Sequence, residues 1–197
     1  MKIEPNYPEL LDNLGATPRP ESSHIGFTQN MVKVALFCQI VLLVYHQLTT
    51  NFDFFSLNGA RNYSVKEKLA EAGSNFVLMA LAPIGFAFHV HALMFYGVIY
   101  YFLLFAAELI IWWVPYFTVP VGSWRGIYNF LLSCATSNFE AGDTLTHWTA
   151  VHERLHGGTM TILPLRQGRP VPNLEHMILH AWTFITAMVT AVAWRGV

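Results

Sequence analysis

A short segment near residue 150 has the residue types and spacing of a zinc-binding helix. Residues 151–158 read VHERLHGG, so His152 and His156 lie four positions apart and Glu153 follows the first. On a helix this spacing puts both imidazoles on one face, where they can bind zinc while the glutamate acts as general base. The alternative is an amphipathic surface helix whose polar side chains only face lipid headgroups, because a five-letter match arises easily in a chain with 9 histidines.

A second pair of histidines has the same spacing. In the segment NLEHMILH, His176 and His180 lie four positions apart, and Glu175 precedes the first of them. Two such pairs can supply four nitrogen ligands to zinc or another transition metal. The predicted metal ligands are therefore His152, His156, His176 and His180. The competing interpretation is that His176 and His180 only form hydrogen bonds at the start of a helix.

Two glutamates are candidates for acid–base chemistry. Glu108 stands between Ala107 and Leu109 in an otherwise apolar run, and Glu175 lies beside His176. A carboxyl group at membrane depth is costly unless it is paired or used, so we predict Glu108 and Glu175 as catalytic groups. A Glu108 that pairs with an arginine or a histidine and serves only packing is the alternative.

Candidate substrate-binding residues lie in a proline-rich segment and in the first apolar run. The segment LPLRQGRPVP carries Arg166 and Arg169, whose guanidinium groups suit an anionic headgroup or substrate. His46 lies close to the end of the apolar run that contains it. We predict these three residues as substrate-binding, whereas a loop that merely covers the end of the fold would carry the same arginines without a ligand.

The composition indicates a membrane protein. Of the 197 residues, 54% are hydrophobic, 15% are aromatic and 12% are charged, whereas a soluble domain carries about 25% charged residues. The formal net charge of −1 and the absence of a basic run argue against a nucleic-acid-binding protein. Cys38 and Cys134 show neither a metal-binding nor a redox spacing.

Four apolar runs are long enough to cross a bilayer, which takes roughly 20 helical residues. The predicted spans are about 31–50, 66–88, 91–114 and 173–194. We expect Pro115 to end the third span, and Trp112, Trp113 and Tyr116 to form an aromatic belt at headgroup level.

The resulting fold is an all-α, polytopic membrane protein with a short amphipathic helix at 143–156 in its last loop. Residues 1–29 are predicted to be an irregular tail, and residues 30–197 a single transmembrane domain. Four spans place the loops 50–65 and 118–172 on one side of the membrane. Most lysines and arginines lie in or beside these loops, so the positive-inside rule places the loops in the cytoplasm.

This topology gathers the candidate residues at one end of the bundle. His46, the loop helix, the end of the third span with Glu108, and the start of the fourth span with Glu175, His176 and His180 all meet at the loop side. The sequence thus predicts a histidine- and glutamate-rich site at one membrane interface.

Several blocks of the sequence resemble an uncharacterised family of small bacterial four-span integral membrane proteins. The most specific are WWVPYF (112–117) and LPxRxxxPVPNLEH (163–176), within a resemblance that covers roughly residues 45–190. The resemblance implies the bacterial inner membrane and no established activity. It also implies a site of His156, Glu175 and His176 with His180 and Glu108, and an aromatic residue more often than histidine at position 152. The HExxH match would then be a coincidence.

Three functions stay open at this point. The first is a metal-dependent membrane enzyme that acts on a lipophilic small molecule. The second is a non-catalytic membrane subunit, or a module that binds a lipid or a membrane-protein partner. The third is a haem-binding membrane protein with histidine ligands on different spans.

Overall fold

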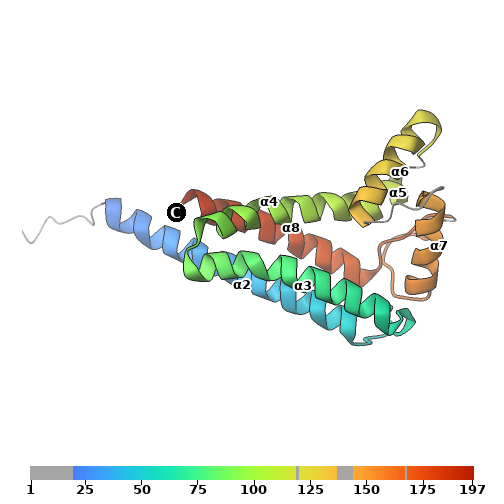
Figure 1. The fold of residues 1–197 in the computed structure, drawn as a ribbon, viewed down its shortest axis with the longest axis horizontal. Helices are drawn as coiled ribbons and strands as arrows, with labels where there is room; N and C mark the ends of the chain where they lie inside the picture. Colours follow the sequence, from blue (N-terminus) through green and yellow to red (C-terminus); the bar gives the residue numbers. More distant parts are fainter. Residues whose placement is uncertain (1–19, 119, 137–143, 167) are drawn as a thin grey trace, which may run out of the picture.

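The computed structural model describes residues 20–118, 120–136, 144–166 and 168–197, and every regular element within them is helical (Figure 1). In chain order the elements are α2 (Pro20–Asn51), η1 (Ala60–Asn62), α3 (Val65–Phe88), α4 (His91–Glu108), η2 (Leu109–Trp113), α5 (Val114–Phe117), α6 (Gly122–Thr136), α7 (Thr144–His156) and α8 (Leu174–Arg195). The prediction of an all-α fold is confirmed.

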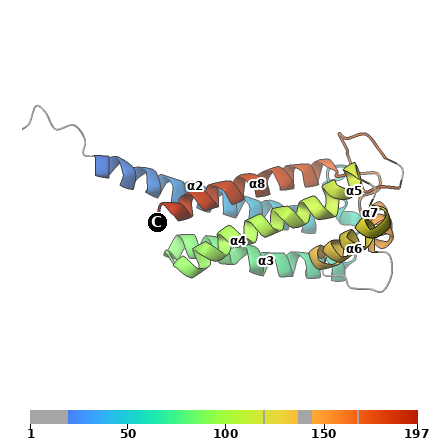
Figure 2. The ribbon, with the colours of Figure 1, turned by 90° about the horizontal axis from the view of Figure 1, so that it is seen from above.

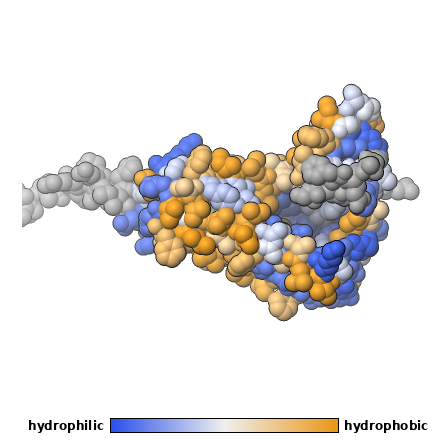
Figure 3. All heavy atoms as spheres, in the orientation of Figure 1, coloured by the Kyte–Doolittle hydropathy of each residue, from blue (hydrophilic) through white to orange (hydrophobic). Residues whose placement is uncertain are grey.

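Four of the helical stretches are long and apolar enough to cross a membrane, as predicted. They are Thr28–Asn51, Val65–Phe88, His91–Phe117 and Leu174–Arg195. Large apolar side chains such as Phe37, Phe76 and Leu103 point outward from them, and Figure 3 shows apolar side chains over much of the visible bundle surface. The four apolar helices suggest an integral membrane protein, since water would solvate such a surface poorly.

The spans form a bundle in which α8 packs against α2 and α4, and α3 packs against the same two helices (Figures 1 and 2). The fully buried side chains at its centre are Leu42, Met79, Ala82, Tyr101 and Ala187. The last turns of α2, the start of α3, the end of α5 and the start of α8 lie at one end, which we call the loop-side end. Helix α7 packs across that end (Figure 1).

The first helix begins earlier than the sequence predicts. Residues 20–29 belong to α2, whereas an irregular segment was expected as far as residue 29. Pro20 is the first residue of the helix, where its missing N–H costs no hydrogen bond and its fixed φ already suits a helix. The rest of the predicted tail, residues 1–19, lies outside the described residues.

The third span continues through Pro115, where the sequence predicts a stop. A π-helical turn at Leu109–Trp113 (η2) precedes the proline, and α5 extends the helix to Phe117. The carbonyl groups exposed by this turn bond to side chains of neighbouring helices. Tyr128 of α6 donates to the oxygen of Ile110 (2.7 Å), and Trp148 of α7 donates to that of Ile111 (3.0 Å). These bonds satisfy the carbonyls, so the helix tolerates its proline.

Helix α6 was not predicted. Its two glycines, Gly122 and Gly126, suggest a loop. Tyr128 and Leu132 are buried, whereas Trp124, Ile127 and Phe130 remain exposed. The hydrogen bond of Tyr128 to the π-helical turn shows why the segment is ordered: its partner lies in the third span, not in the neighbouring sequence.

The short loop helix α7 was predicted at 143–156 and is confirmed at Thr144–His156. It is tied to the start of α3. Ser64 and Glu67 form a capping box, and Glu67 pairs with Arg154 of α7. Asn62 donates to the carbonyl oxygen of Leu155 at 2.8 Å. These bonds fix the end of α7, and therefore His156, over the loop-side end of the bundle.

Candidate metal centre

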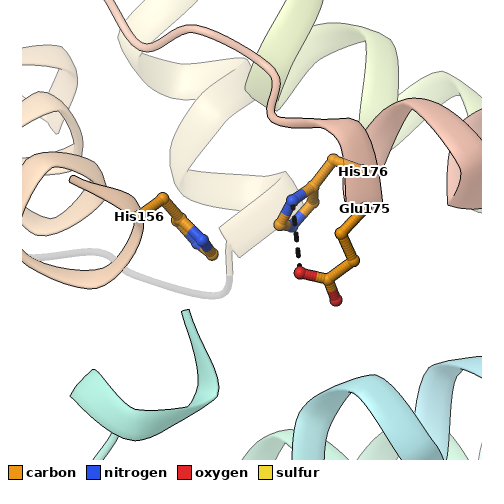
Figure 4. Close-up of side chains that lie close together, drawn as sticks. All are labelled: His156, Glu175 and His176. Atoms are coloured by element: carbon orange, nitrogen blue, oxygen red, sulfur yellow. Dashed lines mark ion pairs between the residues drawn. The ribbon is translucent and has the colours of Figure 1, made fainter. Parts of the chain in front are cut away.

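Three residues with metal-binding side chains converge at the loop-side end. One ligand atom each of His156, Glu175 and His176 lies within 4.8 Å of the other two. Figure 4 shows His156 reaching in from the end of α7, while Glu175 and His176 come from the first turn of α8. We call these residues the trio. They line a cavity of about 50 Å³ together with residues that include His46, Tyr63 and Glu71.

His156 is positioned by close backbone packing. A Cβ atom on Gly59 would lie 2.0 Å from the carbonyl oxygen of Leu155 and 3.3 Å from Nδ1 of His156, so the chain needs glycine there. The Nε2 atom of His156 lies 3.3 Å from the hydroxyl of Tyr63. Among the described residues, its Nδ1 has no hydrogen-bond partner although it is buried. A buried imidazole nitrogen without a partner suits a metal ligand.

His176 is oriented by the residue that caps its helix. Asn173 is the N-cap of α8, and its Oδ1 accepts from the backbone N–H of His176 at 3.0 Å. The same oxygen lies 2.6 Å from Nδ1 of the His176 ring. An amide oxygen only accepts, so in this arrangement Nδ1 carries the proton and Nε2 keeps its lone pair. Residues that fix a histidine in this way are typical of metal sites.

Trp112 lies at the centre of the histidines. Its ring centroid is 3.8 Å from that of His176, 5.1 Å from that of His152 and 5.3 Å from that of His156. The side chain is 5% exposed, and Tyr116 is 2% exposed. The prediction that both belong to an exposed aromatic belt is therefore wrong, because the π-helical turn directs Trp112 into the bundle.

Two histidines of α7, His152 and His156, are held in the neutral state. Burial, with a smaller contribution from neighbouring His152, lowers the pKa of His156 to about 3. Burial also lowers the pKa of His152 to about 4, although a hydrogen bond to Val171 opposes the shift. Neutral imidazole is the form that binds metal, so His156 needs no deprotonation at neutral pH.

The HExxH segment does not form a zincin-type site in this structure. His152 lies outside the trio, and its Nε2 is 3.2 Å from the carbonyl oxygen of Val171. Glu153 is exposed on α7. Only His156 of this segment joins the trio.

His180 and Glu108 also lie outside the trio. Trp113 donates to Nδ1 of His180 at 2.9 Å, which occupies the ring's lone pair. Glu108 is 6% exposed and accepts from Thr183 at 2.9 Å. The packing alternative paired Glu108 with an arginine or a histidine, but its hydrogen-bond partner is the hydroxyl of Thr183. The second oxygen of Glu108 has no partner among the described residues.

The predicted substrate-binding residues separate into two places. His46 lines the cavity beside the trio, with its Nε2 3.7 Å from Oε1 of Glu71. Arg166 and Arg169 lie outside that cavity and donate to the carbonyl oxygen of Tyr116 at 3.4 and 3.1 Å. They hold the segment after α7 against the end of the third span.

Sequence reasoning missed Tyr63, Glu71 and Trp112 as neighbours of the site. Tyr63 and Glu71 are ordinary loop and helix residues in the sequence. For Trp112 the sequence did contain a signal. Pro115 lies three positions later, and a proline disturbs the regular helix around it, so the direction of the Trp112 side chain could be expected to deviate.

No family model, curated protein or solved structure matches this chain. The resemblance to small bacterial membrane proteins therefore stays a prediction.

Proposed function

We propose that this protein is an integral membrane, metal-dependent enzyme whose centre lies at the loop-side end and acts on a lipophilic substrate. The observation that carries the proposal is the convergence of His156, Glu175 and His176 within 4.8 Å beside a cavity. The ligands come from two segments distant in the sequence, and both are held by buried contacts.

The set of three ligands favours a catalytic over a structural metal. Structural zinc sites have four protein ligands, whereas catalytic sites have three and leave a position for water or substrate. A cavity of about 50 Å³ holds an ion with one or two water molecules, and it is too small for a haem. Bound zinc would supply an acidic water molecule and polarise a substrate oxygen. Two histidines and one carboxylate also suit iron(II), which would support redox chemistry instead.

Glu71 is the group that we propose for proton transfer at this centre. It lines the cavity beside the trio, and its Oε1 lies 3.7 Å from Nε2 of His46. Glu175, predicted as a catalytic group, is proposed as a ligand. Glu108 lies deeper in the bundle and is proposed to have a structural role through Thr183.

Metal analysis of detergent-purified protein tests the proposal. We expect about one equivalent of metal per chain in the wild type, and losses of about tenfold or more in affinity for His176→Ala and Glu175→Gln. His147→Ala is the matched control, because His147 is exposed on α7 and lies outside the trio. Thermal unfolding of each variant shows whether a loss of metal reflects a loss of fold.

The bound element distinguishes the reaction classes, since zinc indicates hydrolysis and iron indicates redox chemistry. A wild-type protein that is folded, metal-free and unable to take up zinc or iron contradicts the proposal. The non-catalytic subunit or lipid-binding module would then become the working function.

We propose in addition that the loop-side end faces the cytoplasm of a bacterial inner membrane. The bias of lysine and arginine toward this end supports the orientation. Cys134 offers a direct test, because it is exposed on α6 while Cys38 is buried in the bundle. A maleimide that does not cross membranes should label Cys134 only after the cells are opened. Labelling in intact cells would reverse the orientation.

A further inference from the structure

Helix α6 (Gly122–Thr136) leaves the bundle at an angle to the spans, at the loop-side end (Figures 1 and 2). It has 15 residues, whereas a helix needs roughly 20 to cross a bilayer, so α6 is not a further span. It packs against η2, α7 and α4. Protein therefore covers one side of α6, and the chemistry of the other side indicates what that side contacts.

The covered side of α6 carries the polar contacts. Tyr128 is 1% exposed and donates to the third span. Asn129 accepts from the backbone N–H of Leu145 at 3.2 Å, and the hydroxyl of Ser133 lies 3.0 Å from that of Thr144. Residues one, four and five positions apart lie on the same side of a helix. These bonds fix α6 on the third span and on the start of α7, and they decide which side faces away from the protein.

The opposite side of α6 is apolar and carries no charge. Trp124, Ile127 and Phe130 follow one another at intervals of three residues along this side, and they are 44%, 55% and 64% exposed. The one charged residue of α6 is Arg125, which is half-buried and donates to Thr146 at 3.4 Å. The remaining exposed residues of α6 are Gly122, Ser123, Gly126 and Cys134. Water solvates such a surface poorly, so it is expected to contact an apolar partner.

The depth of α6 identifies that partner. The third span, His91–Phe117, has 27 residues and is about 40 Å long at 1.5 Å per residue, whereas the hydrocarbon core is about 30 Å thick. Its last turns therefore reach the headgroup layer. Tyr128 donates to the carbonyl oxygen of Ile110 at 2.7 Å, and Ile110 lies about two helical turns before Phe117. This bond holds α6 beside those last turns, where the acyl chains meet the headgroups.

We propose that the outer side of α6 rests on the lipid bilayer, at the boundary between headgroups and acyl chains. Helices with one apolar side bind at this depth, and the indole of Trp124 suits it because its apolar ring carries a polar N–H. Cys134, in the last turn, stays within reach of reagents in the water at this boundary. The inference goes beyond the proposed function, because it holds whether or not a metal binds. Through its bonds to α7, α6 would connect the membrane surface to the helix that carries His156.

Spin labels on α6 test the contact in the full chain, reconstituted in phosphatidylcholine vesicles. Ile127→Cys and Phe130→Cys are labelled one at a time in a Cys38→Ala/Cys134→Ala background. Collision rates with oxygen, which concentrates in hydrocarbon, and with a water-soluble nickel chelate are then measured by electron paramagnetic resonance. A label at the lipid boundary should collide with oxygen more often than with the chelate.

Two labelled positions calibrate the measurement. His147→Cys, on an exposed position of α7, reports water. Leu103→Cys reports the hydrocarbon core, because Leu103 is 64% exposed near the middle of the third span. We expect the ratio of oxygen to chelate collisions at Ile127 and Phe130 to lie between these two, severalfold above that at His147. All four positions are exposed, and circular dichroism of each labelled sample verifies the fold.

Two results would overturn the inference. Chelate collisions at Ile127 and Phe130 as frequent as at His147 would show that the outer side of α6 faces water. Low rates with both reagents would show that a protein surface covers it, either a second copy of the chain or another partner. Metal content is measured on the same preparations. Metal-free protein with the lipid pattern contradicts the proposed function and leaves the membrane contact of α6 standing.

Discussion

The indole ring of Trp112 lies over the imidazole of His176, with 3.8 Å between the ring centroids and 36° between the ring planes. This contact joins the π-helical turn of the third span to the first turn of α8. It makes the wall of the proposed metal centre aromatic, and it places a fluorescent side chain in contact with a candidate ligand.

Trp112 should therefore report metal binding. Co²⁺ or Ni²⁺ bound at the trio is expected to quench its emission, because the ions absorb energy over short distances and His176 is in contact with the ring. Trp112→Phe should remove most of the quenching while metal analysis shows that the ion still binds. Trp124→Phe, an exposed change on α6, should leave the quenching as it is. Equal quenching in both variants would place the ion elsewhere.

The buried His152 should make the protein sensitive to acid. Its pKa is about 4 when folded and about 6.5 in an unfolded chain, so the unfolded state binds more protons between these values. The contribution of His152 to the free energy of unfolding is therefore complete above about pH 6.5. It is lost as the pH is lowered toward about 4. His152→Phe should reduce this loss in unfolding experiments across pH.

The same variant tests the HExxH interpretation. His152 lies outside the trio, so His152→Phe should keep its metal, whereas His156→Phe should lose it. Loss of metal from both variants to the same degree would support the zincin arrangement instead.

Gly59 should be intolerant of any side chain. A methyl group there would meet the carbonyl oxygen of Leu155 at 2.0 Å, so Gly59→Ala must push the end of α7 away from η1. We expect a clear loss of stability and of metal affinity, measured by thermal unfolding and metal analysis. Gly73→Ala is the matched control in α3, where nothing lies within 4 Å. It should be neutral or stabilise the helix by up to about 1 kcal/mol. Equal effects of both changes would refute the close packing.

Asn173, the N-cap of α8, should strengthen metal binding because it orients His176. Asn173→Ala removes the acceptor for the backbone N–H and the ring of His176, so we expect about 1 kcal/mol of destabilisation and about 10- to 100-fold weaker metal binding. Asn173→Asp retains the acceptor and should preserve most of both. A metal affinity unchanged in Asn173→Ala would show that the cap does not orient the ligand.

Glu108 and Thr183 should be coupled in stability. In a double-mutant cycle with Thr183→Val and Glu108→Leu, followed by unfolding in mixed micelles, we expect a coupling energy of about 1 kcal/mol. Additive effects would contradict the hydrogen bond between them. Glu108→Gln should leave the metal content unchanged, because Glu108 lies outside the trio.

Much of the fold follows from local features of the sequence. Each span is an apolar run long enough to cross the bilayer, and a helix satisfies its backbone hydrogen bonds within itself. The cap at Asn173 and the glycines after His156 are equally local signals. Topology alone then brings most of the candidate residues to one end.

Tertiary structure decided which residues belong to the site. Spacing of four residues predicted the pairs His152/His156 and His176/His180, because such residues share a face of their own helix. The trio instead combines His156 with two adjacent residues of another helix. Which face of α7 turns inward depends on Gly59, and on the carbonyl oxygen of Ile111 in the π-helical turn, which accepts from Trp148. These contacts join residues distant in the chain, and no local pattern encodes them.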